Sequence, residues 1–212
     1  SAFGASAGTD AFWVAFRIPN FMRRLFAEGS FSTAFVPAFT EVKEKGTLEE
    51  MRLMVSRVAG TLGAILLVIT LLGVVFAPQV TALFAPGSRD EPAKFQFTAD
   101  LLRITFPFLL FISLTAMAGG ILNTFHRFAV PAVVPVIMNL CMIAAALGWM
   151  HYGIPDPSRG KGLESAQGLE WMAWAIVIAG VLQLVVQLPM ISRLGLLSWP
   201  RWGWAAPEVK KV

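Results

Sequence analysis

The sequence is short of charged residues and rich in apolar ones. Only 14% of its 212 residues are Asp, Glu, Lys or Arg, against roughly 25% in soluble domains. In contrast, 56% are hydrophobic, and the mean hydropathy is +0.67. A soluble domain could not bury so much apolar surface. The composition therefore excludes a soluble globular protein and predicts a polytopic membrane protein.

Cysteine and histidine are nearly absent, which excludes several kinds of site. The single cysteine, Cys141, rules out a disulfide framework. The two histidines, His126 and His151, fall at opposite faces of the membrane in the predicted topology, so they cannot share a metal ion. No Gly-rich phosphate loop follows a predicted strand. We therefore expect no metal and no cofactor, and an enzyme is disfavoured.

Long apolar segments predict an all-α, polytopic transmembrane helical bundle. About five helices are expected, at 9–42, 54–77, 101–122, 129–150 and 169–191. The clearest, 54–77, is long enough for a hydrocarbon core about 30 Å thick. Pro78 predicts its end, and Pro107 predicts a kink in the next helix. The link 123–128 is so short that the helices on either side of it must be antiparallel neighbours.

Small and polar residues within these apolar runs predict close packing. Gln183 and Gln187 stand at i,i+4 spacing in an apolar context. Such groups are more often interhelical hydrogen bonds than ligands, contributing about 0.6 kcal/mol or somewhat more. The pair Gly119-Gly120 predicts a close helix contact. None of these residues indicates a catalytic site.

Basic residues are divided unequally between the two ends of the predicted helices. One end carries Lys43, Lys45, Arg52, Arg57, Arg127, Arg193, Arg201, Lys210 and Lys211, and the other Arg89, Lys94, Arg103, Arg159 and Lys161. The first end should be cytoplasmic by the positive-inside rule. The tryptophans would then form belts, with Trp149, Trp171 and Trp174 outside and Trp199, Trp202 and Trp204 inside. This scatter of basic residues argues against binding to nucleic acid.

The first predicted helix differs because it carries charges at membrane depth. Residues 9–39 include Asp10, Arg17, Arg23, Arg24 and Glu28, and the following run 43–50 is expected to be a polar linker. Intramembrane charges persist mainly where they face a polar cavity or a partner. Asp10, Arg17 and Arg24 fall on nearly one helical face, although Pro19 should kink the helix between them. We expect the other helices to hold this one beside a water-filled path.

Two interpretations of Arg23 and Arg24 are equally open from the residues alone. They could be helix-end anchors whose charges reach the inner headgroups. They could instead bind an anion, because guanidinium groups match phosphate oxygens and keep their charge. Asp10 is more simply a helix cap than a ligand. Arg17 could pair with Asp10 across two turns and partly neutralise it.

The run GASAGTDAFWVAFRIPNFMRRLFAEGSFSTAFVPAF closely resembles the second transmembrane helix of the MurJ (MviN) family of bacterial lipid II flippases. The runs ITFPFLLFISLTAMAGGILNTFHRFAVPAVVPVIMNL and AGVLQLVVQLP fit later parts of that family in the same order. The resemblance covers essentially the whole chain. It implies membership of the multidrug/oligosaccharidyl-lipid/polysaccharide superfamily, with two MATE-like helical lobes around a central cavity. Residues 1–212 would then be a partial N-terminal lobe, and we expect a fragment that lacks the C-terminal lobe.

The same resemblance implies a substrate and the residues that contact it. The expected activity is translocation of lipid II, an undecaprenyl-pyrophosphate-linked disaccharide-peptide, from the cytoplasmic to the periplasmic leaflet of the bacterial inner membrane. Asp10 matches the family's acidic residue at the start of the second helix. Arg23 and Arg24 match its arginine pair, and Arg17 stands where the family carries a basic residue. The expected partners are lipid II, membrane lipids and the missing C-terminal lobe.

Two other functions remain open from the sequence. One is export of a drug or of another lipid-linked oligosaccharide on the same fold. An acidic cation site would favour a drug, whereas the arginine pair favours an anionic substrate. The other is a non-transporting membrane scaffold that binds partners or lipid headgroups. In-frame continuation of the coding sequence into further apolar helices would argue against the scaffold.

Overall fold

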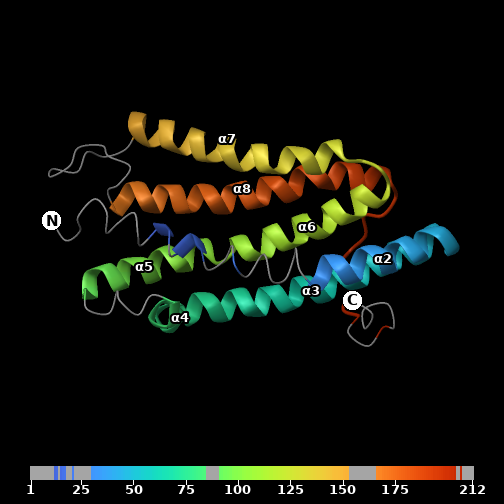
Figure 1. Ribbon diagram of the computed structural model, residues 1–212, viewed down its shortest axis with the longest axis horizontal. Helices are drawn as coiled ribbons and strands as arrows, with labels where there is room; N and C mark the ends of the chain where they lie inside the picture. The colour runs from blue at the N-terminus through green and yellow to red at the C-terminus, as the bar shows by residue number, and fades with distance from the viewer. Residues whose placement is uncertain are drawn as a thin grey trace.

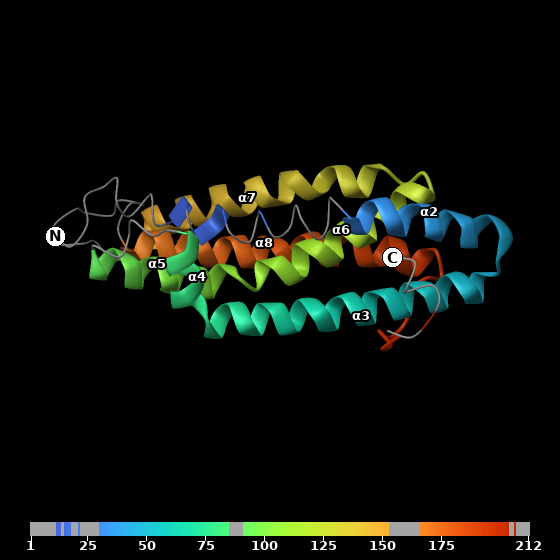
Figure 2. The same ribbon diagram turned by 60° about the horizontal axis from the view of Figure 1, so that its bottom comes forward.

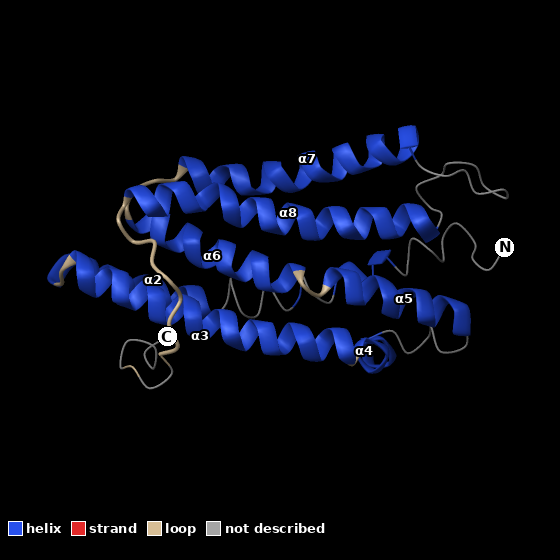
Figure 3. Ribbon diagram, turned by 180° about the vertical axis from the view of Figure 1, so that it is seen from behind, coloured by secondary structure: helices blue, strands red, loops and turns tan. Residues whose placement is uncertain are grey.

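The chain folds into an elongated bundle of α-helices (Figure 1). The computed structural model describes residues 12–13, 15–17, 21, 30–84, 91–152, 166–203 and 206, and this part of the chain contains no strand (Figure 3). The helices are α2 (Ser30–Lys45), α3 (Leu48–Val75), α4 (Ala77–Phe84), α5 (Pro92–Thr105), α6 (Phe108–Thr124), α7 (Ala129–Tyr152) and α8 (Ala166–Arg193). The all-α prediction is confirmed.

Four helical segments of the described residues are long and apolar enough to cross a membrane. They are Leu48–Val75, Pro92–Thr124, Ala129–Tyr152 and Ala166–Arg193. These segments correspond to the last four of the five predicted helices, with ends that differ by up to nine residues. Of the first predicted helix, 9–42, the structure describes residues 12–13, 15–17 and 21, which are helical, and the last part, which forms α2; its other residues lie outside the described ones. The chain is a multi-pass membrane protein.

The polar run 43–50 is not the linker that the sequence predicted. Helix α2 continues to Lys45 and α3 begins directly after Thr47. The charged residues fit helix ends because basic groups suit a C-terminus and acidic groups an N-terminus. Thr47 Oγ1 accepts a hydrogen bond from Glu50 N (3.3 Å), and Thr47 N donates to Glu50 Oε2 (2.7 Å). This capping box starts α3.

Pro78 and Pro107 act differently from the simple stop and the simple kink that the sequence predicts. Pro78 lies in the first turn of the short helix α4, where its missing N–H is not needed. Pro107 separates α5 from α6, so the predicted helix 101–122 is broken rather than only bent. Phe106 N still donates to Leu102 O (2.9 Å), which keeps the two helices in one spanning segment.

Two clusters of buried apolar side chains hold the bundle together. The α5 cluster contains Phe12, Ala15, Leu66, Ala77, Phe97, Leu101, Leu102, Phe106, Phe108, Leu109, Ile112, Leu169, Ala173 and Ile176. The α2 cluster contains Phe35, Phe39, Met51, Met54, Val55, Val58, Met117, Ala118, Ile121, Leu122, Ile191 and Leu196. Helices α3, α6 and α8 contribute to both, and α6 also contacts α2, α3, α7 and α8, so it lies at the centre of the bundle. Helix α7 contributes no buried residue to either cluster and lies along α8 at the edge (Figure 2).

The predicted polar contacts between helices are confirmed. Gln183 Nε2 donates to Val134 O of α7 (2.9 Å), and Gln187 Nε2 donates to Thr115 O of α6 (3.0 Å). Gly119 is buried, and a Cβ there would lie 3.5 Å from Gln187 Oε1. This is an ordinary contact distance, so the tighter approach is at Gly120, where a Cβ would lie 3.3 Å from Val36 Cγ2 of α2.

The predicted division of charge agrees with the helix order except at Arg103, which lies inside the span Pro92–Thr124 and not at its end. Seven described basic residues lie where α2, α6 and α8 end and where α3 and α7 begin: Lys43, Lys45, Arg52, Arg57, Arg127, Arg193 and Arg201. At the opposite end, the rings of Trp149 and Trp171 lie 6.2 Å apart. Trp199 and Trp202 are exposed at the basic end. The assignment of the basic end to the cytoplasm stays a prediction.

Candidate functional site

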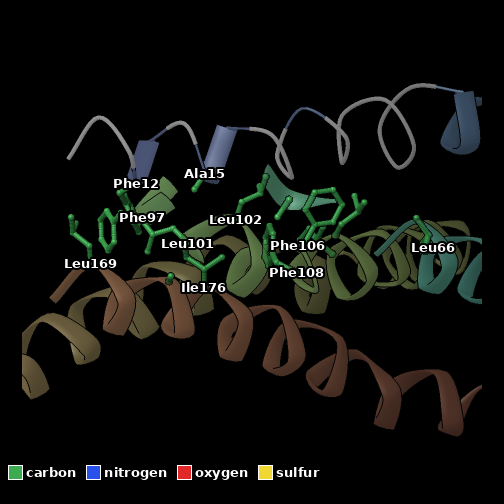
Figure 4. Close-up of a cluster of buried hydrophobic side chains, with 14 residues drawn as sticks. Phe12, Ala15, Leu66, Phe97, Leu101, Leu102, Phe106, Phe108, Leu169 and Ile176 are labelled. Atoms are coloured by element: carbon green, nitrogen blue, oxygen red, sulfur yellow. The ribbon is translucent and has the colours of Figure 1, made fainter. Parts of the chain in front are cut away.

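Arg17 lies on the exposed face of a helical segment that packs onto the bundle. Phe12 and Ala15 of this segment are buried in the α5 cluster, above Leu101 and Leu102 (Figure 4). Trp13 and Arg17 are exposed. Since these two residues are four apart in a helical stretch, they share the face opposite the packed one. The guanidinium group of Arg17 is therefore kept out of the apolar core.

A side chain of α5 completes the backbone hydrogen bonding of this segment. Thr105 Oγ1 shares its one hydroxyl proton between Ala15 O (3.1 Å), ninety residues away in sequence, and Leu101 O of its own helix (3.0 Å). In a helix, Ala15 O would accept from the residue four positions later, but that residue is Pro19, which has no N–H. An unsatisfied carbonyl in a membrane is costly. Thr105 gives Ala15 O a donor from another helix, and Phe16 adds a ring contact with Phe108 at 6.3 Å between centroids.

Thr105→Val should loosen this segment. The change keeps the side-chain volume but leaves Ala15 O without its α5 donor, at an expected cost of about 1–3 kcal/mol and a drop of about 2–10 °C in melting temperature. Thr98→Val is the matched control, because Thr98 is also buried on α5 and its Oγ1 also donates within its own helix, to Lys94 O (2.8 Å), but among the described residues it has no acceptor on another segment. Thermal melting in detergent would compare them, and equal shifts would contradict the proposed contact.

The other predicted site residues cannot be placed. Asp10, Arg23 and Arg24 lie outside the described residues, so Arg17 alone of the four candidates is described. Arg24 follows Arg17 by seven residues, close to two helical turns. The shared face of Asp10, Arg17 and Arg24 therefore stays a prediction.

A cavity that the sequence does not predict lies at the basic end of the bundle. It has a volume of about 760 Å³ and lies between the start of α3 and residues 197–201. Glu49, Arg52 and Ser56 line one wall, and Trp199 and Arg201 line the other. The first three stand at i, i+3 and i+7, which places them on one helical face. That spacing is the signal that the sequence offers, but the predicted linker 43–50 conceals it.

A charge pair within the span Pro92–Thr124 was also missed. Arg103 Nη1 donates to Asp100 Oδ1 (2.5 Å), at i,i+3 spacing on α5. Both side chains are partly exposed, so the pair contributes less than about 1 kcal/mol to stability. Its main effect is that the two charges in an apolar span compensate each other.

Comparison with known proteins identifies the family. The family model described as "Lipid II flippase MurJ" matches residues 1–212. The chain belongs to this family. The "Probable lipid II flippase MurJ" of Vibrio cholerae is 41% identical over 216 residues, which cover 99% of this chain and 39% of the relative. The "Lipid II flippase MurJ" of Burkholderia cenocepacia is 39% identical over 216 residues, covering 100% of this chain and 39% of the relative.

A solved structure of the MurJ family has the same fold. It is described as "Lipid II flippase MurJ, inward closed conformation" and superposes with a TM-score of 0.70 at 27% identity, covering 96% of this chain and 38% of that one. The chain thus spans about two fifths of the length of these relatives. The family resemblance and the polytopic fold predicted from sequence are confirmed. So is the prediction of a multi-pass protein of the bacterial inner membrane.

Proposed function

We propose that the chain is part of a flippase that moves lipid II from the cytoplasmic to the periplasmic leaflet. The observation that carries this proposal is the family match over residues 1–212. The packing of Phe12 and Ala15 supports it, since it turns Arg17 away from the core. Binding and release are sufficient for such transport, so the chain is not an enzyme.

The chemistry of the substrate explains why a charged helix is useful. Lipid II carries a pyrophosphate between an apolar tail and a large sugar-peptide head. The head must cross the membrane through a hydrated cavity while the tail stays in lipid. Cationic groups in a cavity of low dielectric attract the pyrophosphate and offset its desolvation. We assign this contact to Arg23 and Arg24, with Arg17 beside them and Asp10 as a balancing charge.

The chain supplies one of two lobes in this proposal. Residues 1–212 form part of the N-terminal lobe, and a C-terminal lobe closes the cavity and rocks against it. The proposal is supported by the length of the relatives, of which the chain covers 39%. A drug would need an acidic cation site, whereas three of the four candidate residues are arginines.

A chimera tests the proposed function. Residues 1–212 would replace the aligned part of the Vibrio cholerae relative in bacteria depleted of their own lipid II flippase. The chimera should restore growth and prevent accumulation of lipid II, whereas the 212 residues alone should not. A chimera that reaches the membrane but does not restore growth would contradict the substrate assignment. Rescue by the 212 residues alone would contradict the two-lobe arrangement.

A further inference from the structure

The chain leaves α8 through an ordered turn and then runs back along α3. Gly195 has a φ of +74°, its N–H donates to Ser192 O (2.9 Å), and Leu196 N donates to Ile191 O (3.2 Å). These bonds form a Schellman motif, and Leu196 is fully buried behind it. Residues 197–203, here called the strap, follow the turn and lie beside the first part of α3, near the C label in Figure 2.

The strap is fixed to α3 by polar contacts. Ser56 Oγ donates to Trp199 O (2.5 Å), and Arg201 N donates to Ser56 O (3.0 Å). Gly60 permits this approach, because a Cβ at that position would overlap the carbonyl of Arg201. One turn earlier on α3, Ser198 Oγ donates to the carbonyl of Arg52 (3.4 Å). The strap therefore has a defined position and forms a wall of the 760 Å³ cavity.

The cavity presents charges of both signs. Arg52 and Arg201 line it together with Glu49 and Glu50. Glu50 Oε2 already accepts a hydrogen bond from Thr47 N, so of the two carboxylates Glu49 is the one with more capacity to bind a ligand. Within the described ranges, neither guanidinium group forms an ion pair with these acids. The site therefore offers two bidentate donors and an acceptor to a ligand that carries both a negative and a positive group.

The surroundings are those of a membrane interface. Trp199 is 89% exposed and Leu197 45% exposed beside the cavity, and aromatic side chains of this kind collect at the level of lipid headgroups. The cavity also lies at the end of the bundle where α3 begins, next to its apolar span. A lipid headgroup could enter there while its acyl chains rest on the apolar surface.

We propose that this cavity binds the headgroup of a zwitterionic phospholipid that carries a primary ammonium group. Arg52 and Arg201 donate to the phosphate, because guanidinium groups match its oxygens. Glu49 accepts from the ammonium, which has three N–H donors. A purely anionic headgroup would leave the carboxylates facing negative charge, and a quaternary ammonium has no N–H to donate. This lipid is bound, not transported, so the site goes beyond the proposed flippase activity.

Lipid retention by the purified chain tests the site. The detergent-solubilised chain would be mixed with equimolar phosphatidylethanolamine, phosphatidylcholine and phosphatidylglycerol of identical acyl chains, and retained lipid measured by native mass spectrometry. Phosphatidylethanolamine should be retained about five- to tenfold better than the other two, the factor expected for charged hydrogen bonds near a surface. Equal retention, or preference for phosphatidylglycerol, would overturn the proposal.

Four variants separate charge from geometry. Arg201→Gln and Glu49→Gln should each remove the preference, whereas Lys94→Gln at the opposite end of the bundle should preserve it. Gly60→Ala should also remove it, because the strap must shift although every charged group remains. Retained selectivity in Arg201→Gln, Glu49→Gln or Gly60→Ala would overturn the assignment. The assay involves no transport, so its outcome is independent of growth rescue by the chimera.

Discussion

A single methyl group added at Gly73 is expected to destabilise the bundle strongly. Gly73 is buried on α3, and a Cβ there would overlap the ring of Phe106. That ring is only 5% exposed and belongs to the α5 cluster. It cannot move freely, because Phe106 lies at the break before Pro107 and its N–H is bonded to Leu102 O. Overpacking of this kind costs about 1–3 kcal/mol, a drop of about 2–10 °C in melting temperature.

Gly63→Ala is the matched control for Gly73→Ala. Gly63 lies on the same helix, and a Cβ there would meet no atom within 4 Å. Alanine is favoured over glycine inside a helix by about 1 kcal/mol, so this change should be neutral or slightly stabilising. Thermal melting of both variants in one detergent would measure the difference. Equal melting temperatures would show that the packing of α3 against Phe106 does not limit stability.

The sequence predicts the spanning helices well because a single property, the length of an apolar run, decides where they form. A run of about twenty apolar residues has few alternatives in a membrane, and α7 and α8 begin and end within three residues of their predicted bounds. The break between α5 and α6 is different. Pro107 permits either a kink or a break, and the outcome depends on packing around Phe106, including contact with Gly73 from another helix. The sequence around Pro107 does not show that a residue of another helix packs against Phe106.

The two candidate sites also combine features that local sequence shows with features that depend on contacts between distant segments. The motif around Arg17 identifies the family, but periodicity could not show that Thr105 of another helix donates to the carbonyl of Ala15. The cavity at the basic end combines one face of α3 with the strap, and their meeting depends on the turn at Gly195 and on the small side chain of Gly60. Charges on separate segments form a site only after such long-range contacts, which a single sequence does not reveal.

Arg23→Ala is expected to abolish growth rescue by the chimera without lowering its amount in the membrane. The two interpretations of the arginine pair predict different results. An anchor at the headgroups contributes little, because its charge stays in water. A pyrophosphate ligand in a cavity contributes more, since two unit charges about 4 Å apart at an effective dielectric of about 20 attract by about 4 kcal/mol. Loss of that attraction from the translocation path would stop transport.

Arg127→Ala is the control that separates these interpretations. Arg127 is exposed in the short link between α6 and α7, at the basic end of the bundle, and represents an anchor outside the charged helix. It should retain growth rescue. Arg23→Lys should rescue partly, because lysine keeps the charge but loses the planar fork that binds two phosphate oxygens. If Arg23→Ala grew as well as Arg127→Ala, Arg23 would be an anchor. The substrate contact would then have to come from other cationic groups, with Arg17 and Arg24 the next to replace.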